Sequence, residues 1–301
     1  MTKILVTGGA GFIGSNLVSR LESTGNRVTV IDNLSSGNKN NLKGFKGKLI
    51  VSDVSKEVVL KENFDLIYHL ASITDTTCPS DRNMMLQNFK GFQNILEFTK
   101  IHNSKLVYAS SAAVYGKGKV PMKESQKKMP LNAYAQSKLM MDKLAERHFN
   151  NMHIVGLRYF NAFGPGEKYK GKSASMIYQL TKKMLKGERP KLFRYGQQKR
   201  DFIFIEDVVQ TSFNAQNTKK SGVYNVGTGV STSFNDILNM LNVYLDKSIK
   251  PIYIQNKINH KYQTHTKADT RLSTKFLNFK AKYKLAEAIK IYVDYIRKEN
   301  E

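Results

Sequence analysis

A tyrosine and a lysine stand four positions apart, at Tyr134 and Lys138, in a stretch whose pattern predicts a helix. That spacing puts both side chains on one helical face. A phenol with a pKa of about 10 is a poor base at neutral pH, but a neighbouring ammonium stabilises the phenolate and lowers that pKa. The pair can therefore take a proton from a hydroxyl group. Taken alone, the same spacing is also common among exposed residues of surface helices.

A serine supplies a third candidate group. Ser111 follows a predicted strand at 106–109, and its neighbour Ser110 is the alternative position. Open α/β sheets bind their ligands at the carboxyl ends of the strands. A hydroxyl at this edge is therefore suited to orient a substrate oxygen near Tyr134.

A run of glycines follows the first predicted strand, in the order Gly8-Gly9-Ala10-Gly11-Phe12-Ile13-Gly14. Small residues here let the chain turn tightly, let a pyrophosphate approach the backbone and let the next helix pack closely on its strand. The N-terminus of that helix presents amide groups and a positive dipole end to phosphates. The sequence therefore predicts a dinucleotide site that includes Gly8, Gly11, Phe12, Ile13 and Gly14.

Two aspartates end the next two predicted strands. Asp32 is suited to accept a hydrogen bond from a ribose 2′-hydroxyl, which favours NAD because a 2′-phosphate would meet a carboxylate. Lys39, in the following loop, can pair with such a phosphate, so NAD and NADP both remain open. Asp53 either binds the adenine amino group or caps its own loop. Asn33, beside Asp32, is included in the same cofactor site.

Short apolar runs alternate with helical patterns in the first half of the chain. The predicted strands are 4–6, 28–31, 48–51, 66–70, 106–109 and 153–157, and the predicted helices are 14–23, 84–102 and 133–150. This rhythm is typical of a parallel, doubly wound sheet, so we expect an α/β fold of the Rossmann type. We assign 1–160 to an NAD(P)-binding domain, to which segments near 200–228 return, and 161–301 mainly to a smaller substrate-binding lobe.

The chain has 301 residues, of which 48 are basic and 24 acidic, giving a net charge of +24. Because the lysines are spread along the whole sequence, a solvated basic surface is favoured over steering of an anionic substrate, and both over nucleic-acid binding. We expect no nucleic-acid partner. We also expect no membrane partner, since no apolar run reaches the length of about 18 residues that suggests a span.

The remaining composition points to an ordinary reducing compartment. A single cysteine, Cys78, excludes an internal disulfide, and the N-terminus lacks the pattern of a signal peptide, so a cytoplasmic location is expected. The six histidines show no spacing of metal ligands, and no metal is expected.

The glycine run, Ser111 and the Tyr134–Lys138 pair together resemble the extended short-chain dehydrogenase/reductase family, and more narrowly its NAD(P)-dependent nucleotide-sugar epimerases. The resemblance implies that Tyr134 is the acid/base, that Lys138 tunes it and holds the nicotinamide ribose, and that Ser111 orients the substrate. It further implies cofactor contacts at Leu70, Ala71, Ser72, Asn88, Lys138 and Ala162.

Within that family, two features narrow the reaction. Ala112 and Ala113 follow Ser111 where dehydratases carry an acidic pair, so elimination is disfavoured and epimerisation favoured. The segments 158–175, 190–193 and 199–208 are similar to the branch of ADP-glycero-manno-heptose 6-epimerases. That resemblance implies Lys170 as a second acid/base, with a phosphate ligand or a bystander as alternatives and Lys168 as the runner-up position.

The same resemblance implies a set of substrate contacts. These are Asn161, Lys172, Gln179, Phe193, Arg200 and Tyr262. Lys172 and Gln179 depart from the branch, which carries a small hydroxyl residue and a histidine there. A UDP-glucose or UDP-galactose 4-epimerase, or a related enzyme on another nucleotide-diphosphate sugar, therefore stays open, as does a non-catalytic protein that senses NAD(P). The family resemblance also implies a homo-oligomer.

Overall fold

A computed structural model describes residues 1–56, 60, 62–74, 81–256 and 262–299. Seven parallel strands form its central sheet, in the order β11-β6-β5-β4-β1-β2-β3. Their bounds are β1 Lys3–Thr7, β2 Arg27–Asp32, β3 Lys48–Val51, β4 Leu66–His69, β5 Lys105–Ser111, β6 Ile154–Tyr159 and β11 Gly222–Val226. The expectation of a doubly wound α/β fold is confirmed, and each predicted strand lies within two residues of an observed one.

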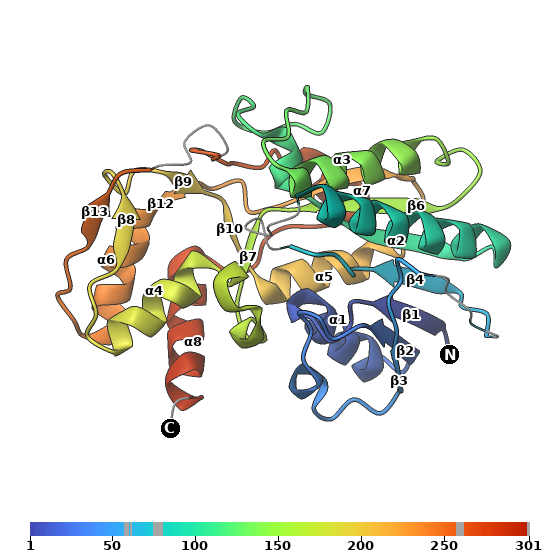
Figure 1. Cartoon of the computed structure of the whole chain (residues 1–301), viewed down its shortest axis with the longest axis horizontal. Helices are drawn as coiled ribbons and strands as arrows, with labels where there is room; N and C mark the ends of the chain where they lie inside the picture. The colour runs from blue at the N-terminus through green and yellow to red at the C-terminus, as the bar shows by residue number, and fades with distance from the viewer. Residues whose placement is uncertain (57–59, 61, 75–80, 257–261, 300–301) are drawn as a thin grey trace.

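Helices cover both faces of this sheet (Figure 1). α2 packs against α3 on one face, and α1 against α5 on the other. The bounds are α1 Phe12–Ser23, α2 Asp81–Ile101, α3 Ala133–Glu146, α5 Ile205–Ala215 and α7 Arg271–Leu277. The helix predicted to reach residue 150 ends at Glu146, and turns follow it.

The apolar strands are explained by this double covering. In β1, Ile4 and Val6 pack into the cluster beneath α1 and α5, whereas Leu5 packs beneath α2. Successive side chains of a strand point to opposite faces, so a strand buried on both faces is mostly apolar along its length. That requirement makes β1, β2, β4, β5 and β6 readable as short apolar runs, whereas the edge strand β3 is only partly buried.

The order of the strands also locates a binding crevice. The chain leaves β1 toward β2 on one side and reaches β4 on the other, so β1 and β4 lie at the point where the winding reverses. In open α/β sheets the crevice beyond the carboxyl ends of these two strands binds the ligand. The glycine turn follows β1, and the segment beginning at Leu70 follows β4.

The second half of the chain builds a smaller lobe beside the sheet, drawn at the left of Figure 1. The described residues of this lobe form three two-stranded sheets and three α-helices. These are β7 Asn161–Phe163 with β10 Phe202–Phe204, β9 Lys199–Arg200 with β12 Thr232–Ser233, β8 Lys191–Phe193 with β13 Ile252–Ile254, and α4 Met176–Leu185, α6 Phe234–Leu245 and α8 Leu285–Lys298. β11, in contrast, pairs with β6 and extends the central sheet.

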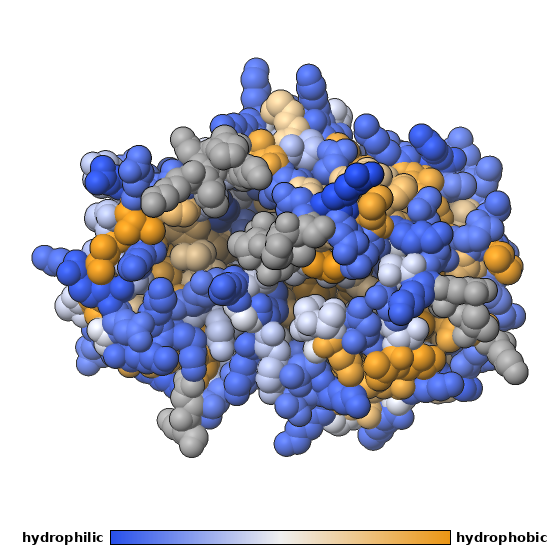
Figure 2. Space-filling model, viewed as in Figure 1, coloured by the Kyte–Doolittle hydropathy of each residue, from blue (hydrophilic) through white to orange (hydrophobic). Residues whose placement is uncertain are grey.

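Hydrophilic residues cover most of the face shown in Figure 2, and apolar residues occur there in separate groups. Within the described parts of the chain, none of the helices is both long and apolar enough to span a membrane. Nor do three or more His, Cys, Asp or Glu side chains gather there in a way that could hold a metal ion. Cys78 and His260 lie outside the described residues.

Candidate active site

One large cavity, of about 1170 Å³, lies between the carboxyl edge of the sheet and the smaller lobe. It brings together every predicted site residue except one. Its lining includes Gly8, Gly11, Phe12, Ile13, Gly14, Asp32, Asn33, Asp53, Leu70, Ala71, Ser72, Asn88, Ser111, Tyr134, Lys138, Asn161, Ala162, Lys170, Lys172, Gln179, Phe193, Arg200 and Tyr262. Residues from both halves of the sequence therefore share one site.

The exception is Lys39, which does not line the cavity. It begins the short helix η1, Lys39–Leu42, and its side chain is exposed. The Asn38 amide donates to the Ala10 carbonyl at 3.0 Å, and the Asn38 side chain accepts from the Asn40 amide at 2.9 Å. These bonds fix the loop, and Lys39 lies on it outside the cavity lining, so its contact with a 2′-phosphate stays a prediction.

The glycine turn has one closed side and one open side. A Cβ on Gly14 would lie 2.1 Å from the Gly8 carbonyl oxygen, so only glycine lets α1 pack this closely. A Cβ on Gly11 would meet only that same oxygen, at 3.2 Å, and nothing else within 4 Å. Gly11 is also the N-cap of α1 and lacks a side-chain cap. The open side at Gly11 therefore gives an anion access to the helix amides.

Asp32 is buried at the end of β2, with 7% of its surface exposed. Its carboxylate accepts hydrogen bonds from the amides of Ala10, at 2.9 Å, and Leu34, at 2.8 Å. Burial raises the pKa of Asp32, although these two bonds oppose the rise. A Cβ on Gly37 would lie 2.7 Å from the carboxylate, so the loop after Asp32 closes tightly over it.

Asp53 follows β3, the strand that pairs with β2, and lies beside Asn33. The Asn33 amide group donates to Asp53 at 3.4 Å, and the Ser55 backbone amide donates at 2.8 Å. Burial by itself raises the pKa of Asp53, but the hydrogen bonds from Ser55 and Asn33 outweigh it and the net shift is downward. The carboxylate thus caps its own loop while it still faces the cavity.

Asn88 of α2 fixes the segment that follows β4. Its side chain accepts from the Ile73 amide at 2.7 Å and donates to the Ile73 carbonyl at 3.0 Å and to the Ser137 hydroxyl at 3.2 Å. Its role is therefore to hold the cavity wall against α3. The hydroxyls of Ser72 and Ser110 are buried without a partner among the described residues.

Those free hydroxyls provide a test of whether a dinucleotide fits. Buried polar groups are nearly always hydrogen-bonded, so two unpaired hydroxyls on a cavity wall indicate a polar ligand. The open side of Gly11 suits its phosphates, and the carboxylate of Asp32 suits a ribose hydroxyl. The residues present therefore fit NAD.

Tyr134 and Lys138 lie on the cavity face of α3. The Lys138 ammonium donates to the Ala109 carbonyl at 2.8 Å and lies 5.8 Å from the centre of the Tyr134 ring. Burial lowers the pKa of Lys138 to about 8, and the charge of Asp142 opposes that fall. Burial raises the pKa of Tyr134, while its hydrogen bond with Ser111 lowers it. The phenol is thus protonated and held between a hydroxyl and a cation.

Lys170 enters the cavity from a segment that we call the strap, residues 164–175, which contains the short helix η3, Lys168–Ser173. Its ammonium lies 4.9 Å from the centre of the Phe12 ring, above the glycine turn. Burial lowers the pKa of Lys170, and the charge of Glu167 opposes the change. A lysine with a lowered pKa can exchange protons more readily near neutral pH.

Glu167 forms hydrogen bonds with both ends of the strap. It is fully buried and accepts hydrogen bonds from the Gly164 amide at 3.2 Å, the Ser175 amide at 2.6 Å and the Ser175 hydroxyl at 2.8 Å. No sequence pattern marks Glu167 as a site residue. Its partners are two backbone amides and a serine hydroxyl, and such partners do not distinguish a buried glutamate from an exposed one in the sequence.

Arg200, Tyr262 and Phe193 form a cluster at the far end of the cavity. The Arg200 guanidinium lies 4.9 Å from the centre of the Tyr262 ring and donates to the Gln263 carbonyl. Phe193 packs its ring edge-on against Tyr262, with centres 5.3 Å apart. Burial lowers the pKa of Arg200, with Tyr262 opposing. An aromatic wall beside a guanidinium suits a base and a diphosphate.

The other predicted substrate residues differ in how free their side chains are. Asn161 is exposed to the cavity and its side chain accepts from Thr266 at 3.5 Å. Lys172 is exposed on the strap. Gln179 donates to the carbonyls of Lys172, at 3.2 Å, and Ala174, at 2.7 Å. Gln179 therefore supports the strap at the cavity edge. The lining also contains Lys183, Lys191 and Gln198, which no sequence pattern marks as site residues.

Residues 4–227 match the family described as "NAD dependent epimerase/dehydratase family". The chain is 38% identical to the ADP-L-glycero-D-manno-heptose-6-epimerase of Brachyspira hyodysenteriae, and the alignment covers 89% of each chain.

Two solved structures are closely similar in fold. The ADP-L-glycero-D-manno-heptose-6-epimerase of Helicobacter pylori has a TM-score of 0.92 and 39% identity over 98% of this chain and 96% of its own. The UDP-glucose 4-epimerase of Thermotoga maritima, solved with UDP-glucose, has a TM-score of 0.93 and 28% identity over 99% and 100% of the two chains. The two enzymes differ in substrate, so similarity of fold alone does not select between them.

Proposed function

The chain belongs to the NAD dependent epimerase/dehydratase family, and on that premise we propose that it epimerises an ADP-glycero-manno-heptose at its exocyclic carbon C6″. The observation that carries this choice is Lys170. Its partly dehydrated ammonium lies over Phe12 and lines the same cavity as Tyr134. The two heptose epimerases above are also more similar in sequence to this chain than the 4-epimerase is.

Tyr134 acts as the first acid/base. In its phenolate form Tyr134 takes the proton of the substrate hydroxyl, and Ser111, which hydrogen-bonds to Tyr134, is placed to orient the same substrate oxygen. The charged Lys138, 5.8 Å from the Tyr134 ring, favours the phenolate while that proton is transferred. NAD held in this cavity would supply the acceptor, and later the donor, of the hydride.

Lys170 acts as the second acid/base. Inversion at an exocyclic carbon requires the hydride to return to the opposite face of the intermediate ketone, so the ketone must turn and its oxygen takes a second position. Lys170 comes from the strap and Tyr134 from α3, so each of the two groups can exchange a proton with the ketone oxygen in one of these positions. The lowered pKa of Lys170 suits this exchange.

The cofactor that these residues favour is NAD. Asp32 is buried where a ribose 2′-hydroxyl would bind, and both of its oxygens already accept backbone hydrogen bonds. A 2′-phosphate would meet that carboxylate, and Lys39, the cation that would pair with such a phosphate, does not line the cavity. We also propose that the chain forms a homo-oligomer and that the boundary between its NAD(P)-binding domain and the substrate-binding lobe lies at residue 160.

The main alternative is a 4-epimerase acting on UDP-glucose or UDP-galactose. Such an enzyme needs one acid/base, because the keto sugar turns over within the site. Under that alternative, Lys170 binds a phosphate of the substrate. A protein that only senses NAD has no need of Ser111, Tyr134 and Lys138 in one cavity, so this grouping favours an enzyme over a sensor.

The test is incubation of the purified protein with ADP-D-glycero-D-manno-heptose, without added cofactor, followed by proton NMR of C6″. We expect the L-glycero epimer to form, and Lys170→Ala to lower turnover at least about 100-fold. The matched control is Lys168→Ala, two positions earlier on the same strap and exposed, which should keep nearly full activity.

Conversion of UDP-glucose to UDP-galactose by wild type and Lys170→Ala alike would establish the 4-epimerase instead. Cofactor binding without turnover of any nucleotide sugar would support the sensor.

A further inference from the structure

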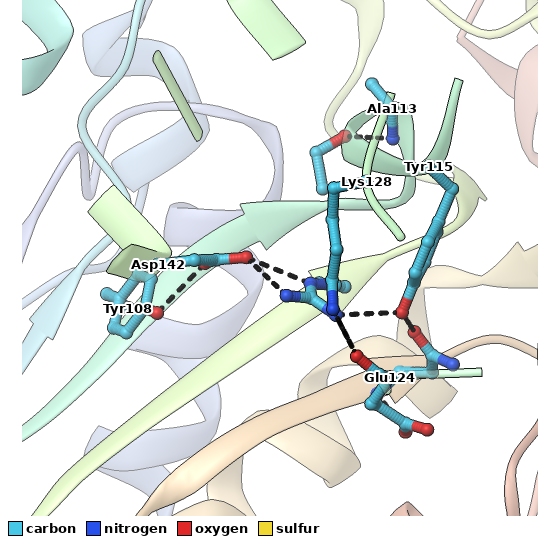
Figure 3. A network of polar contacts seen from close by, with 9 residues as sticks. Tyr108, Ala113, Tyr115, Glu124, Lys128 and Asp142 are labelled. Atoms are coloured by element: carbon cyan, nitrogen blue, oxygen red, sulfur yellow. Dashed lines mark hydrogen bonds and ion pairs between the residues drawn. The ribbon is translucent and has the colours of Figure 1, made fainter. Parts of the chain in front are cut away.

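A buried ion pair lies behind the candidate catalytic residues and has no part in the proton transfers above. Arg158, at the end of β6, pairs with Asp142 of α3, and each of the two side chains is 1% exposed. The guanidinium donates to one Asp142 oxygen through Nε, at 2.9 Å, and contacts it through a terminal nitrogen at 2.8 Å. Figure 3 shows Asp142 and Tyr108 on one side of this network and Tyr115 on the other.

Asp142 shares the helical face of Tyr134 and Lys138, because the three residues follow one another at intervals of four. Its second oxygen accepts from the Tyr108 hydroxyl at 2.9 Å, and the Lys138 ammonium donates to the neighbouring Ala109 carbonyl at 2.8 Å. Helix α3 is therefore bound to two consecutive residues of β5. These contacts limit both rotation and sliding of the helix that carries the phenol.

The other end of the network reaches the segment after Ser111. The Arg158 guanidinium donates to the Tyr115 hydroxyl at 3.0 Å, and that hydroxyl donates to Asn225 of β11 at 2.6 Å. Tyr115 ends the short helix η2, Ala112–Tyr115, whose N-cap is Ser111 itself. One guanidinium thus connects the helix of Tyr134 with the segment that begins at Ser111.

The backbone leaves room for this arrangement. A Cβ on Gly156 of β6 would lie 2.5 Å from the Tyr108 hydroxyl oxygen, so the phenol reaches Asp142 only because Gly156 has no side chain. Stability alone is a weak reason for such a pair, since buried ion pairs are often replaceable by apolar residues without loss of stability. A role in fixing geometry accounts for the pair better.

We propose that Asp142 and Arg158 are positioning residues for the proposed function above, linking the Ser111 segment to the helix of Tyr134 and Lys138 so that the three groups keep one relative placement. Neither residue lines the cavity. They therefore act through the residues they hold and not on the substrate.

The pair also sets the charge around Lys138. Groups facing Asp142 are Tyr108 from β5, Arg158 from β6, Tyr115 from η2, Lys138 on its own helix and Lys128 from the loop before that helix, while Glu146 of the same helix acts on Tyr108 and Lys128. Lys138 is faced in addition by His69 of β4. Burial lowers the pKa of Lys138 and Asp142 opposes this. Removing the charge of Asp142 while Arg158 remains should lower that pKa further.

The test compares Asp142→Asn, Arg158→Met and the double variant with wild-type holoenzyme. We expect Asp142→Asn to lower kcat at least about tenfold with KM changed less than threefold, and to move the alkaline limb of the kcat profile to lower pH. The double variant should recover most of the lost thermal stability, because no charge is left buried alone, but it should not recover kcat. Asp294→Asn, in the exposed ion pair with Arg297, is the matched control that should change none of these values.

A second readout does not depend on the substrate. In protein labelled with ¹³C at lysine Cε, the titration of Lys138, assigned by its loss in Lys138→Met, should shift to lower pH in Asp142→Asn. If wild type converts no nucleotide sugar, the proposed function fails, while this titration still decides the inference. An unchanged Lys138 titration in Asp142→Asn, or a double variant that regains both stability and kcat, would overturn it.

Discussion

Gly11→Ala should separate cofactor binding from folding. Gly11 has φ −79° and ψ 177°, which alanine adopts freely. The added methyl group would meet only the Gly8 carbonyl oxygen, at 3.2 Å, and otherwise project into open space on the cavity side. That space is where a pyrophosphate would approach the first amides of α1. The substitution therefore leaves the turn intact and obstructs its ligand.

The expected magnitude follows from the hydrogen bonds at risk. If the methyl group keeps a phosphate from two amides of the first turn, at about 1.5 kcal/mol each for a charged acceptor, NAD binding weakens by about 3 kcal/mol. This corresponds to a Kd raised roughly 150-fold. The free energy of unfolding should change by less than about 1 kcal/mol, because the backbone conformation suits alanine.

Gly14→Ala is the matched comparison. Its Cβ would lie 2.1 Å from the Gly8 oxygen and 2.8 Å from the Gly9 Cα, and neither backbone atom can move without shifting α1. We expect a loss of about 1–3 kcal/mol in the free energy of unfolding. The measurements are calorimetric titration of cofactor-free protein with NAD and urea denaturation of both variants. Unchanged NAD affinity in Gly11→Ala would refute the assignment of its open side to the phosphates, and so would equal destabilisation by the two substitutions.

Three further predictions concern the residues around the site. Burial, and after it the charge of Lys138, lowers the pKa of His69 to about 3. Between pH 8 and 5.5 only the unfolded chain therefore binds this proton, and the free energy of unfolding should fall by about 1.4 kcal/mol. Urea denaturation of His69→Asn over the same pH range should lack this decrease. Asp32→Asn should weaken NAD binding about tenfold and NADP binding less, and calorimetry with both cofactors checks the difference. Gly156→Ala should cost about 1–3 kcal/mol of stability, and less in a Tyr108→Val background, because its Cβ would strike the Tyr108 phenol. Equal costs in the two backgrounds would contradict that contact.

Much of the fold follows from local patterns. β1, β2, β4, β5 and β6 are mostly apolar at successive positions because both faces of the sheet are covered there, and such runs are visible in any one segment. The smaller lobe is harder to read, since its strands are only two or three residues long and pair with partners far away in sequence. Nothing within such short segments specifies their partners.

The sequence by itself determined the glycine turn, the aspartate after β2 and the helical spacing of Tyr134 and Lys138, because each depends on residues close together in the chain. Only the tertiary structure decided that Lys39 faces solvent, that Glu167 closes the strap, and that Arg158 joins α3 to the Ser111 segment. Each of these depends on partners or burial that the packed backbone creates. The side-chain type is written in the sequence, but whether a charge is buried, and against what, is settled only when distant segments meet.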